Sequence, residues 1–147
     1  MLAIRHIGLT VSDMEKSLKF YQDLLGFKLI KNNLESGDYI DNFSDLQKVQ
    51  VTTAKLCDPQ GSRVLLELLQ YHSHPHEPKS TLRPICDVGY SHFAITVDNL
   101  DQLYEKLLRN GIRFNSPPQH SPDGYAKVTF CRDPEGNLIE LVEVIGD

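Results

Sequence analysis

Four polar side chains stand at matched places in this chain and could together bind a divalent metal ion. His6 and His92 each open a short apolar segment, and Glu67 and Glu140 each lie among apolar neighbours in a later one. A carboxylate in such surroundings is costly unless it is paired, protonated or bound to a cation. Two imidazoles and two carboxylates form a competent ligand set for Zn, Ni, Co, Mn or Fe(II). The sequence therefore predicts one mononuclear metal site formed by these four residues.

The alternative is that duplication has left two buried His–Glu ion pairs. A single His in an apolar strand is more often a hydrogen-bonded core residue than a ligand, so neither imidazole alone predicts a metal. Buried ion pairs, however, are weak sources of stability. The matched placement of both pairs therefore favours a cation.

These four residues occupy matched places because the sequence contains an internal repeat, and such a repeat indicates a duplicated structural unit. The segment HIGLTV at 6–11 recurs as HFAITV at 92–97. The turn and strand DPQG and LEL, at 58–61 and 66–68, recur as DPEG and IEL at 133–136 and 139–141. Side chains alternate along a strand, so each Glu faces away from its Leu and Ile neighbours.

Helices and further strands are predicted at matching places in each half. The first helix begins at a capping box of Ser12 and Glu15 and ends at Gly26; the second is capped by Asp98 or Asn99 and ends at Gly111. Alternation and β-branched content predict strands at 27–29, 49–56, 112–114 and 125–131. Each half reads β-α-β-β-β, which gives an α+β fold with modules 1–72 and 89–147 and a connector at 73–88.

Two segments depart from the repeat, and we expect both at the rim of the site. The segment 31–47 contains Tyr39 and Phe43 in a short helix or loop, and 115–124 contains His120. These three side chains and Tyr125 could contact a substrate or merely pack.

Bulk composition restricts the class of partner. The chain has 147 residues, 40% of them hydrophobic, which is enough for a sizeable core. A net charge of -5 without basic runs excludes nucleic acid and anionic membranes as expected partners. The sequence shows neither a membrane helix nor the apolar region of a signal peptide, so we expect a cytoplasmic protein. The three cysteines lack C-x-x-C spacing, which predicts buried free thiols.

The repeated segments resemble the vicinal oxygen chelate superfamily, also called the glyoxalase/bleomycin resistance/dioxygenase fold. The resemblance spans nearly the whole chain and rests on HIGLTVSDMEKSLKFYQDLLGF from His6, VLLELL from Val64, HFAITVDNLD from His92 and DPEGNLIEL from Asp133. It implies paired β-α-β-β-β modules whose sheets curl into a U-shaped cleft around a divalent metal.

The ligand pattern is most similar to that of glyoxalase I within this superfamily. Extradiol dioxygenases and fosfomycin-resistance transferases typically use two His and one Glu, whereas glyoxalase I has a ligand at all four places. Methylmalonyl-CoA epimerases have a similar set, with an amide at the second place. Bleomycin-binding members mostly lack metal ligands. Glyoxalase I usually also carries an Arg and an Asn that hold glutathione. Those places are Thr10 and Tyr71 here, and the resemblance implies that these two side chains contact the substrate.

The resemblance implies a lyase or isomerase of lactoylglutathione lyase type. Glu140 or Glu67 would take a proton from a carbon next to an oxygen that the metal polarises. The alternatives are an epimerase, an Fe(II) dioxygenase of extradiol type and a non-catalytic binding or resistance protein. We expect a small-molecule substrate and a homodimer, with the site completed within one chain or across two.

A second group of imidazoles lies in the connector region. His72, His74 and His76 surround Pro75. Their spacing permits a second metal site, but the proline and the position favour a solvent-exposed loop.

Overall fold

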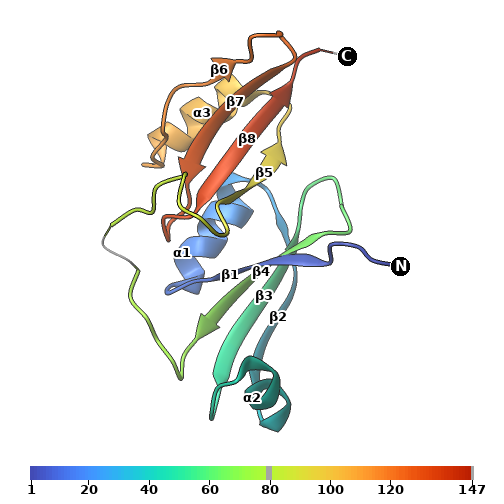
Figure 1. Cartoon of the computed structure of the whole chain (residues 1–147), viewed down its shortest axis with the longest axis vertical. Coiled ribbons are helices and arrows are strands. Elements are labelled where there is room, and N and C mark those ends of the chain that lie inside the picture. Colours follow the sequence, from blue (N-terminus) through green and yellow to red (C-terminus); the bar gives the residue numbers. More distant parts are fainter. Residues whose placement is uncertain (79–80, 147) are drawn as a thin grey trace. The chain divides into compact units, whose positions relative to one another are not determined.

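The computed structural model describes residues 1–78 and 81–146, and the chain divides into two compact units, Met1–Pro78 and Lys79–Asp147. Each unit contains a four-stranded mixed sheet and one main helical segment (Figure 1). The α+β fold with two similar β-α-β-β-β modules, predicted from the repeat, is confirmed.

The first unit is built on the strand order β1-β4-β3-β2. Its elements are β1 (His6–Thr10), α1 (Met14–Leu18), η1 (Lys19–Leu24), β2 (Lys28–Ser36), α2 (Asp38–Ser44), β3 (Gln50–Cys57) and β4 (Leu65–Tyr71). The outer strand β1 runs parallel to β4, and the other pairs are antiparallel. This register places Gly8 directly beside Glu67.

One face of this sheet is buried, whereas the other is buried at Val51 and Thr53 but exposed at His6 and Thr10. Leu66, Leu68 and Leu56 point to the buried face and are at most 4% exposed. The helical segment is tied to β4 by Gln70, whose side chain accepts from the Met14 backbone N–H and donates to the Ser12 carbonyl. We call the opposite face, which carries His6, the site face.

The second unit repeats this plan with the order β5-β8-β7-β6. Its elements are β5 (His92–Thr96), α3 (Leu100–Arg109), β6 (Gln119–His120), β7 (Ala126–Arg132) and β8 (Leu138–Val144). Strand β5 is parallel to β8, and Ala94 lies beside Glu140. Glu143, on the other face of β8, accepts a 2.7 Å hydrogen bond from the Leu100 backbone N–H and so fixes the start of α3. The site face of this sheet carries His92.

Two local predictions were wrong, the cap of the first helix and the second-module strand at 112–114, whereas the end of the first helix at Gly26 is confirmed. The first helix is capped by Asp13, whose side chain accepts from the Lys16 N–H, because Ser12 lies one residue too early. The helix also widens into the π-helical turn η1 before Gly26, which adopts a φ of 81°. The second-module strand at 112–114 is a single bridge from Phe114 to Cys131, and β6 forms later.

The segment 31–47 is more regular than a rim loop. Strand β2 continues through Ser36, after a bulge between Leu29 and Lys31, because it pairs with β3 along most of its length. Helix α2 follows, and Ile40 packs with Val49 and Val51 in a buried cluster.

The cysteines are free thiols in three environments. Cys131 is buried, Cys57 is half-buried and Cys86 is exposed. The prediction of buried thiols is therefore right for Cys131 only. Burial raises the pKa of Cys131 to about 12, because a thiolate would lose its hydration there. Within the described residues, no helix has the length and apolar character needed to cross a membrane.

Asp133→Ala should lower the free energy of unfolding by roughly 2–3 kcal/mol, because backbone N–H groups of the turn then lose their charge-assisted hydrogen bonds to the buried carboxylate. Asp133 is 4% exposed and accepts from the Glu135 and Asn137 N–H groups at 3.0 and 2.8 Å. Urea denaturation measures the loss. The matched control is Asp58→Ala in the repeated turn, which is more exposed and should cost about 1 kcal/mol or less. Equal losses would contradict this interpretation.

A thiol reagent should modify Cys86 first and leave Cys131 unmodified in the folded protein. The thiolate is the nucleophile that attacks the reagent. Cys131 does not form a thiolate near neutral pH, and its side chain is buried. Mass-spectrometric mapping after brief treatment with iodoacetamide measures the order. Early modification of Cys131 under native conditions would show that β7 opens readily.

Candidate metal centre

The first unit brings one imidazole and one carboxylate together on its site face. His6 Nε2 lies 3.4 Å from Glu67 Oε2. The pair forms because β1 and β4 are adjacent parallel strands whose register places the two side chains on the same face. The Glu67 side chain is only 12% exposed, whereas that of His6 is 45% exposed. An accessible imidazole nitrogen thus lies beside a largely buried carboxylate.

The second unit contains the same pair, built from the repeated strands. His92 Nε2 lies 3.1 Å from Glu140 Oε2. Phe130, directly across from Glu140 on β7, packs edge-on against the imidazole with ring centroids 5.0 Å apart. The other ring nitrogen, Nδ1, lies 2.9 Å from Ser91 Oγ.

These contacts suit a cation. In each pair the nitrogen and the ionised carboxylate oxygen both present lone pairs, so a proton or a metal ion must lie between them. Imidazole Nε2 and carboxylate oxygen are also ordinary ligands of divalent transition metals. The donor set therefore fits such an ion.

Each unit contributes only half of the predicted ligand set. Across residues 1–78 and 81–146, no three His, Cys, Asp or Glu side chains are grouped so that they could hold a metal. His6 is grouped with Glu67 and His92 with Glu140, two ligands in each case. A four-ligand site therefore needs the two pairs to be combined, which remains a prediction.

The predicted substrate contacts lie in different environments. Thr10 is exposed on the site face of β1, two residues beyond Gly8. Tyr71, at the end of β4, packs against the buried cluster around Val51. Tyr39 and Phe43 form an edge-to-face pair on α2 at 5.1 Å and are 85% and 65% exposed.

Two further candidates lie in the second unit. His120 is exposed on β6, opposite Lys127. Tyr125 is 50% exposed and its backbone carbonyl accepts from Ile145 and Gly146. Both side chains are exposed, so a substrate could reach them.

The imidazoles after β4 form a loop, as favoured by the sequence. His72 Nε2 lies 2.6 Å from Thr52 Oγ1, His74 Nδ1 lies 2.8 Å from Ser73 Oγ, and His76 Nδ1 lies 3.1 Å from the His74 carbonyl. Each ring is occupied by a different local partner, so the loop does not support a second metal site.

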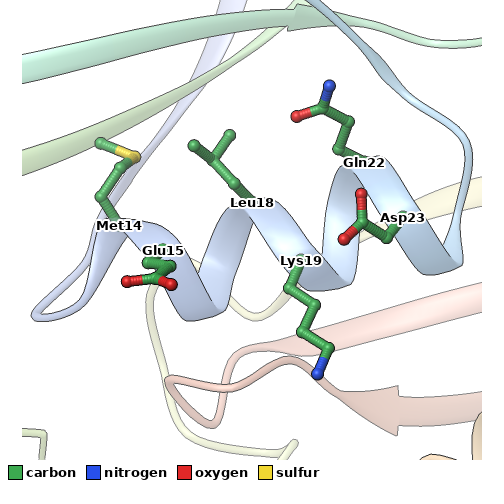
Figure 2. Close-up of a pocket in the computed structure, with 6 residues that line it drawn as sticks. All are labelled: Met14, Glu15, Leu18, Lys19, Gln22 and Asp23. Atoms are coloured by element: carbon green, nitrogen blue, oxygen red, sulfur yellow. The ribbon is translucent and has the colours of Figure 1, made fainter.

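A hollow in the first unit is lined by residues other than His6 and Glu67. It lies along α1 and η1 (Figure 2) and is lined by Met14, Glu15, Leu18, Lys19, Gln22 and Asp23. None of the predicted ligands borders it, so we assign it no part in metal binding.

Sequence reasoning missed two residues that contact His92. Phe130 would have been found only from the register of β7 with β8, which places it opposite Glu140. Ser91 had a local signal, because a hydroxyl directly before a histidine can reach the ring.

Comparison with known families places these pairs in context. The model of the "Glyoxalase/Bleomycin resistance protein/Dioxygenase superfamily" matches residues 3–141. An uncharacterised protein of Bacillus subtilis, YwkD, is 32% identical over 96% of both chains. The lactoylglutathione lyase of Escherichia coli O157:H7 is 25% identical over 97% of this chain and 93% of its own. A probable chloroplastic lactoylglutathione lyase of Arabidopsis thaliana is 26% identical over 94% of this chain, which spans 35% of that relative.

Solved structures share the fold. A glyoxalase family protein from Bacillus cereus superposes with a TM-score of 0.88 at 21% identity, over 99% of this chain and 96% of that one. The trypanothione-dependent glyoxalase I of Leishmania major superposes with a TM-score of 0.66 at 24% identity, over 97% and 87%.

His6→Ala and His92→Ala should each abolish tight binding of a divalent ion, because either change leaves only one of the two imidazoles of the predicted site. Each loss should exceed the roughly 10–100-fold effect of removing a supporting outer-shell hydrogen bond. Elemental analysis after dialysis against Zn²⁺ measures it, with His120→Ala as the control that keeps the metal. Full retention by either variant would contradict a shared site.

Proposed function

Because the chain belongs to the glyoxalase/bleomycin resistance protein/dioxygenase superfamily, we propose that it is a divalent-metal-dependent lyase or isomerase of glyoxalase I type. The observation that carries this proposal is the repeated pairing of one imidazole with one carboxylate, at 3.4 and 3.1 Å. The lactoylglutathione lyases among the relatives support the reaction class at 25–29% identity.

We assign His6, Glu67, His92 and Glu140 as the ligands of one ion, which is Zn, Ni, Co, Mn or Fe(II). When bound, a divalent cation supplies Lewis acidity, which polarises a substrate oxygen and makes the adjacent C–H more acidic. The residues of the chain hold the reacting groups and move the proton.

Glu140 is our first choice for the base, and Glu67 is the second carboxylate. Glu140 is 24% exposed and lies beside the Phe130 ring that packs on His92. It would take a proton from the substrate carbon and return it to the neighbouring carbon, which gives isomerisation.

The substrate class follows from this chemistry. A proton on a carbon next to a carbonyl or hydroxyl is needed, as in hemithioacetals and α-hydroxy ketones. The two places that hold an Arg and an Asn in the glyoxalase I pattern are Thr10 and Tyr71 here. Thr10 is exposed on the site face, and Tyr71 packs against the buried cluster of the first unit. We therefore include hemithioacetals of thiols other than glutathione among the proposed substrates.

An epimerase is the second candidate, because the same two carboxylates can return the proton to the carbon it left. The two activities differ in product only: isomerisation moves hydrogen to the next carbon, and epimerisation inverts one centre. Proton NMR in deuterated water separates them, because the label enters at different carbons. Oxygen consumption with a catechol would instead indicate a dioxygenase, and absence of metal and turnover would indicate a binding protein.

Two arrangements complete the four-ligand site. Modules 1–72 and 89–147, joined by the connector 73–88, could combine within one chain or across a homodimer. Mixing His6→Ala chains with His92→Ala chains distinguishes them. If the site spans two chains, the mixed dimer regains one intact site; if it lies within one chain, mixing restores no metal binding.

Glu140→Gln should lower turnover by about 10²–10⁴-fold, because the amide can still face the ion but cannot accept the proton. Turnover of a hemithioacetal panel and exchange of the substrate proton with solvent measure the effect. Glu143→Gln is the matched control on the same strand: its side chain points to the other face, and an amide oxygen can still accept from Leu100. Wild-type exchange in Glu140→Gln would eliminate Glu140 as the base.

A further inference from the structure

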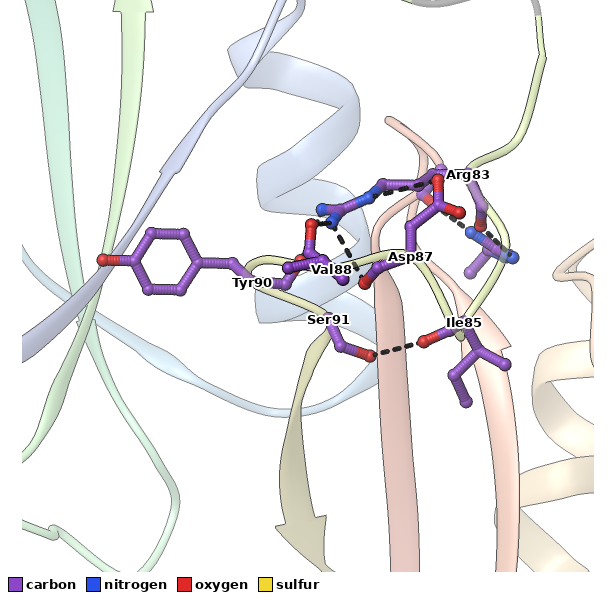
Figure 3. A network of polar contacts seen from close by, with 8 residues as sticks. Arg83, Ile85, Asp87, Val88, Tyr90 and Ser91 are labelled. Carbon is purple, nitrogen blue, oxygen red and sulfur yellow. Dashed lines mark hydrogen bonds and ion pairs between the residues drawn. The ribbon is translucent and has the colours of Figure 1, made fainter.

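The Ser91 hydroxyl connects the His92 ring to the loop that precedes β5. Ser91 Oγ lies 2.9 Å from His92 Nδ1. It also donates to the Ile85 carbonyl at 3.3 Å (Figure 3). A carbonyl oxygen only accepts, and a serine hydroxyl has one proton to give. When that proton is directed to Ile85, Ser91 accepts from the imidazole, and the ring hydrogen then lies on Nδ1.

This assignment determines what Nε2 can do. A neutral imidazole has one N–H, and with that hydrogen on Nδ1 the lone pair stands on Nε2. Nε2 lies 3.1 Å from the Glu140 carboxylate, which also presents lone pairs. The contact is then favourable only with a positive centre between the two atoms, and a metal ion can replace the proton there.

The loop that holds Ile85 and Ser91 is itself fixed by Arg83. The guanidinium donates to the backbone carbonyls of Asp87 (3.3 Å), Val88 (2.7 Å) and Tyr90 (Figure 3). Gly89 makes room for this: a Cβ there would lie 2.9 Å from Arg83 Nη2, and its φ is 125°. Because three backbone carbonyls of the loop accept from the Arg83 guanidinium, the loop is held in one conformation.

Arg132 then links this loop to the turn before β8. Its guanidinium donates to the Arg83 carbonyl at 3.0 Å and to the Gly136 carbonyl at 2.9 Å. Within the second unit, Arg132 therefore connects the loop that holds Ser91 to the turn before β8, the strand that carries Glu140.

We propose that Ser91 is a positioning residue that keeps the proton of His92 on Nδ1 and so leaves Nε2 to bind the cation beside Glu140. The inference rests on the proposed function for the identity of the cation site. It concerns the second unit only, because the residue before His6 is Arg5, whose guanidinium has donors and no acceptor.

Ser91→Ala should weaken Zn²⁺ binding by about 10–100-fold, the usual cost of losing an outer-shell partner of a ligating histidine. Competition with a chromophoric chelator measures the affinity. Ser91→Thr keeps the hydroxyl and should retain wild-type affinity. Ser73→Ala is the matched control, because it removes an equivalent contact from Ser73 Oγ to His74 Nδ1 at 2.8 Å on a ring outside both pairs.

Nitrogen-15 NMR of the Zn²⁺-loaded protein provides a readout independent of activity. The wild type should show His92 with its proton on Nδ1 and the metal on Nε2, with a slowly exchanging Nδ1–H that Ser91→Ala exposes to solvent. Unchanged affinity in Ser91→Ala, or a proton on Nε2 in the loaded wild type, would overturn the role of Ser91. A wild type that binds no Zn²⁺ would instead remove the proposed function on which the inference rests.

Discussion

The candidate site depends on one backbone interaction, the parallel pairing of the first and last strands in each unit. Strand β1 lies beside β4, and β5 lies beside β8, although the paired residues are 59 positions apart in the first unit and 46 in the second. Because neighbouring residues in register share a face, this pairing brings an imidazole from the first strand next to a carboxylate from the last. A one-residue slip would turn either side chain into the buried face.

Burial on the opposite face enforces that register. Ile139 and Leu141 are fully buried on either side of Glu140, and Leu66 and Leu68 are buried on either side of Glu67. Apolar burial of this extent stabilises each strand in one orientation only, at roughly 1.5–3 kcal/mol for each fully buried side chain. Packing on the opposite face therefore holds Glu67 and Glu140 on the site face of each sheet.

The repeat made much of this predictable, whereas features that depend on register or loop conformation were not. Matched segments identified His6, Glu67, His92 and Glu140 and the β-α-β-β-β order, because period-two and helical patterns are local. The extension of β2 to Ser36 depends on its pairing with β3, which no local pattern reports. The contact of Ser91 with His92 depends on a loop curved around Arg83, which only the folded backbone reveals.

The central claim is that two half-sites, one from each unit, combine around one ion. X-ray absorption spectroscopy of the loaded protein tests it directly, because imidazole rings give a scattering pattern whose intensity reports their number for each metal ion. We predict two imidazoles, those of His6 and His92, with oxygen ligands completing the coordination and no sulfur. A spectrum with one imidazole for each ion, unchanged when either His6 or His92 is replaced, would contradict the claim.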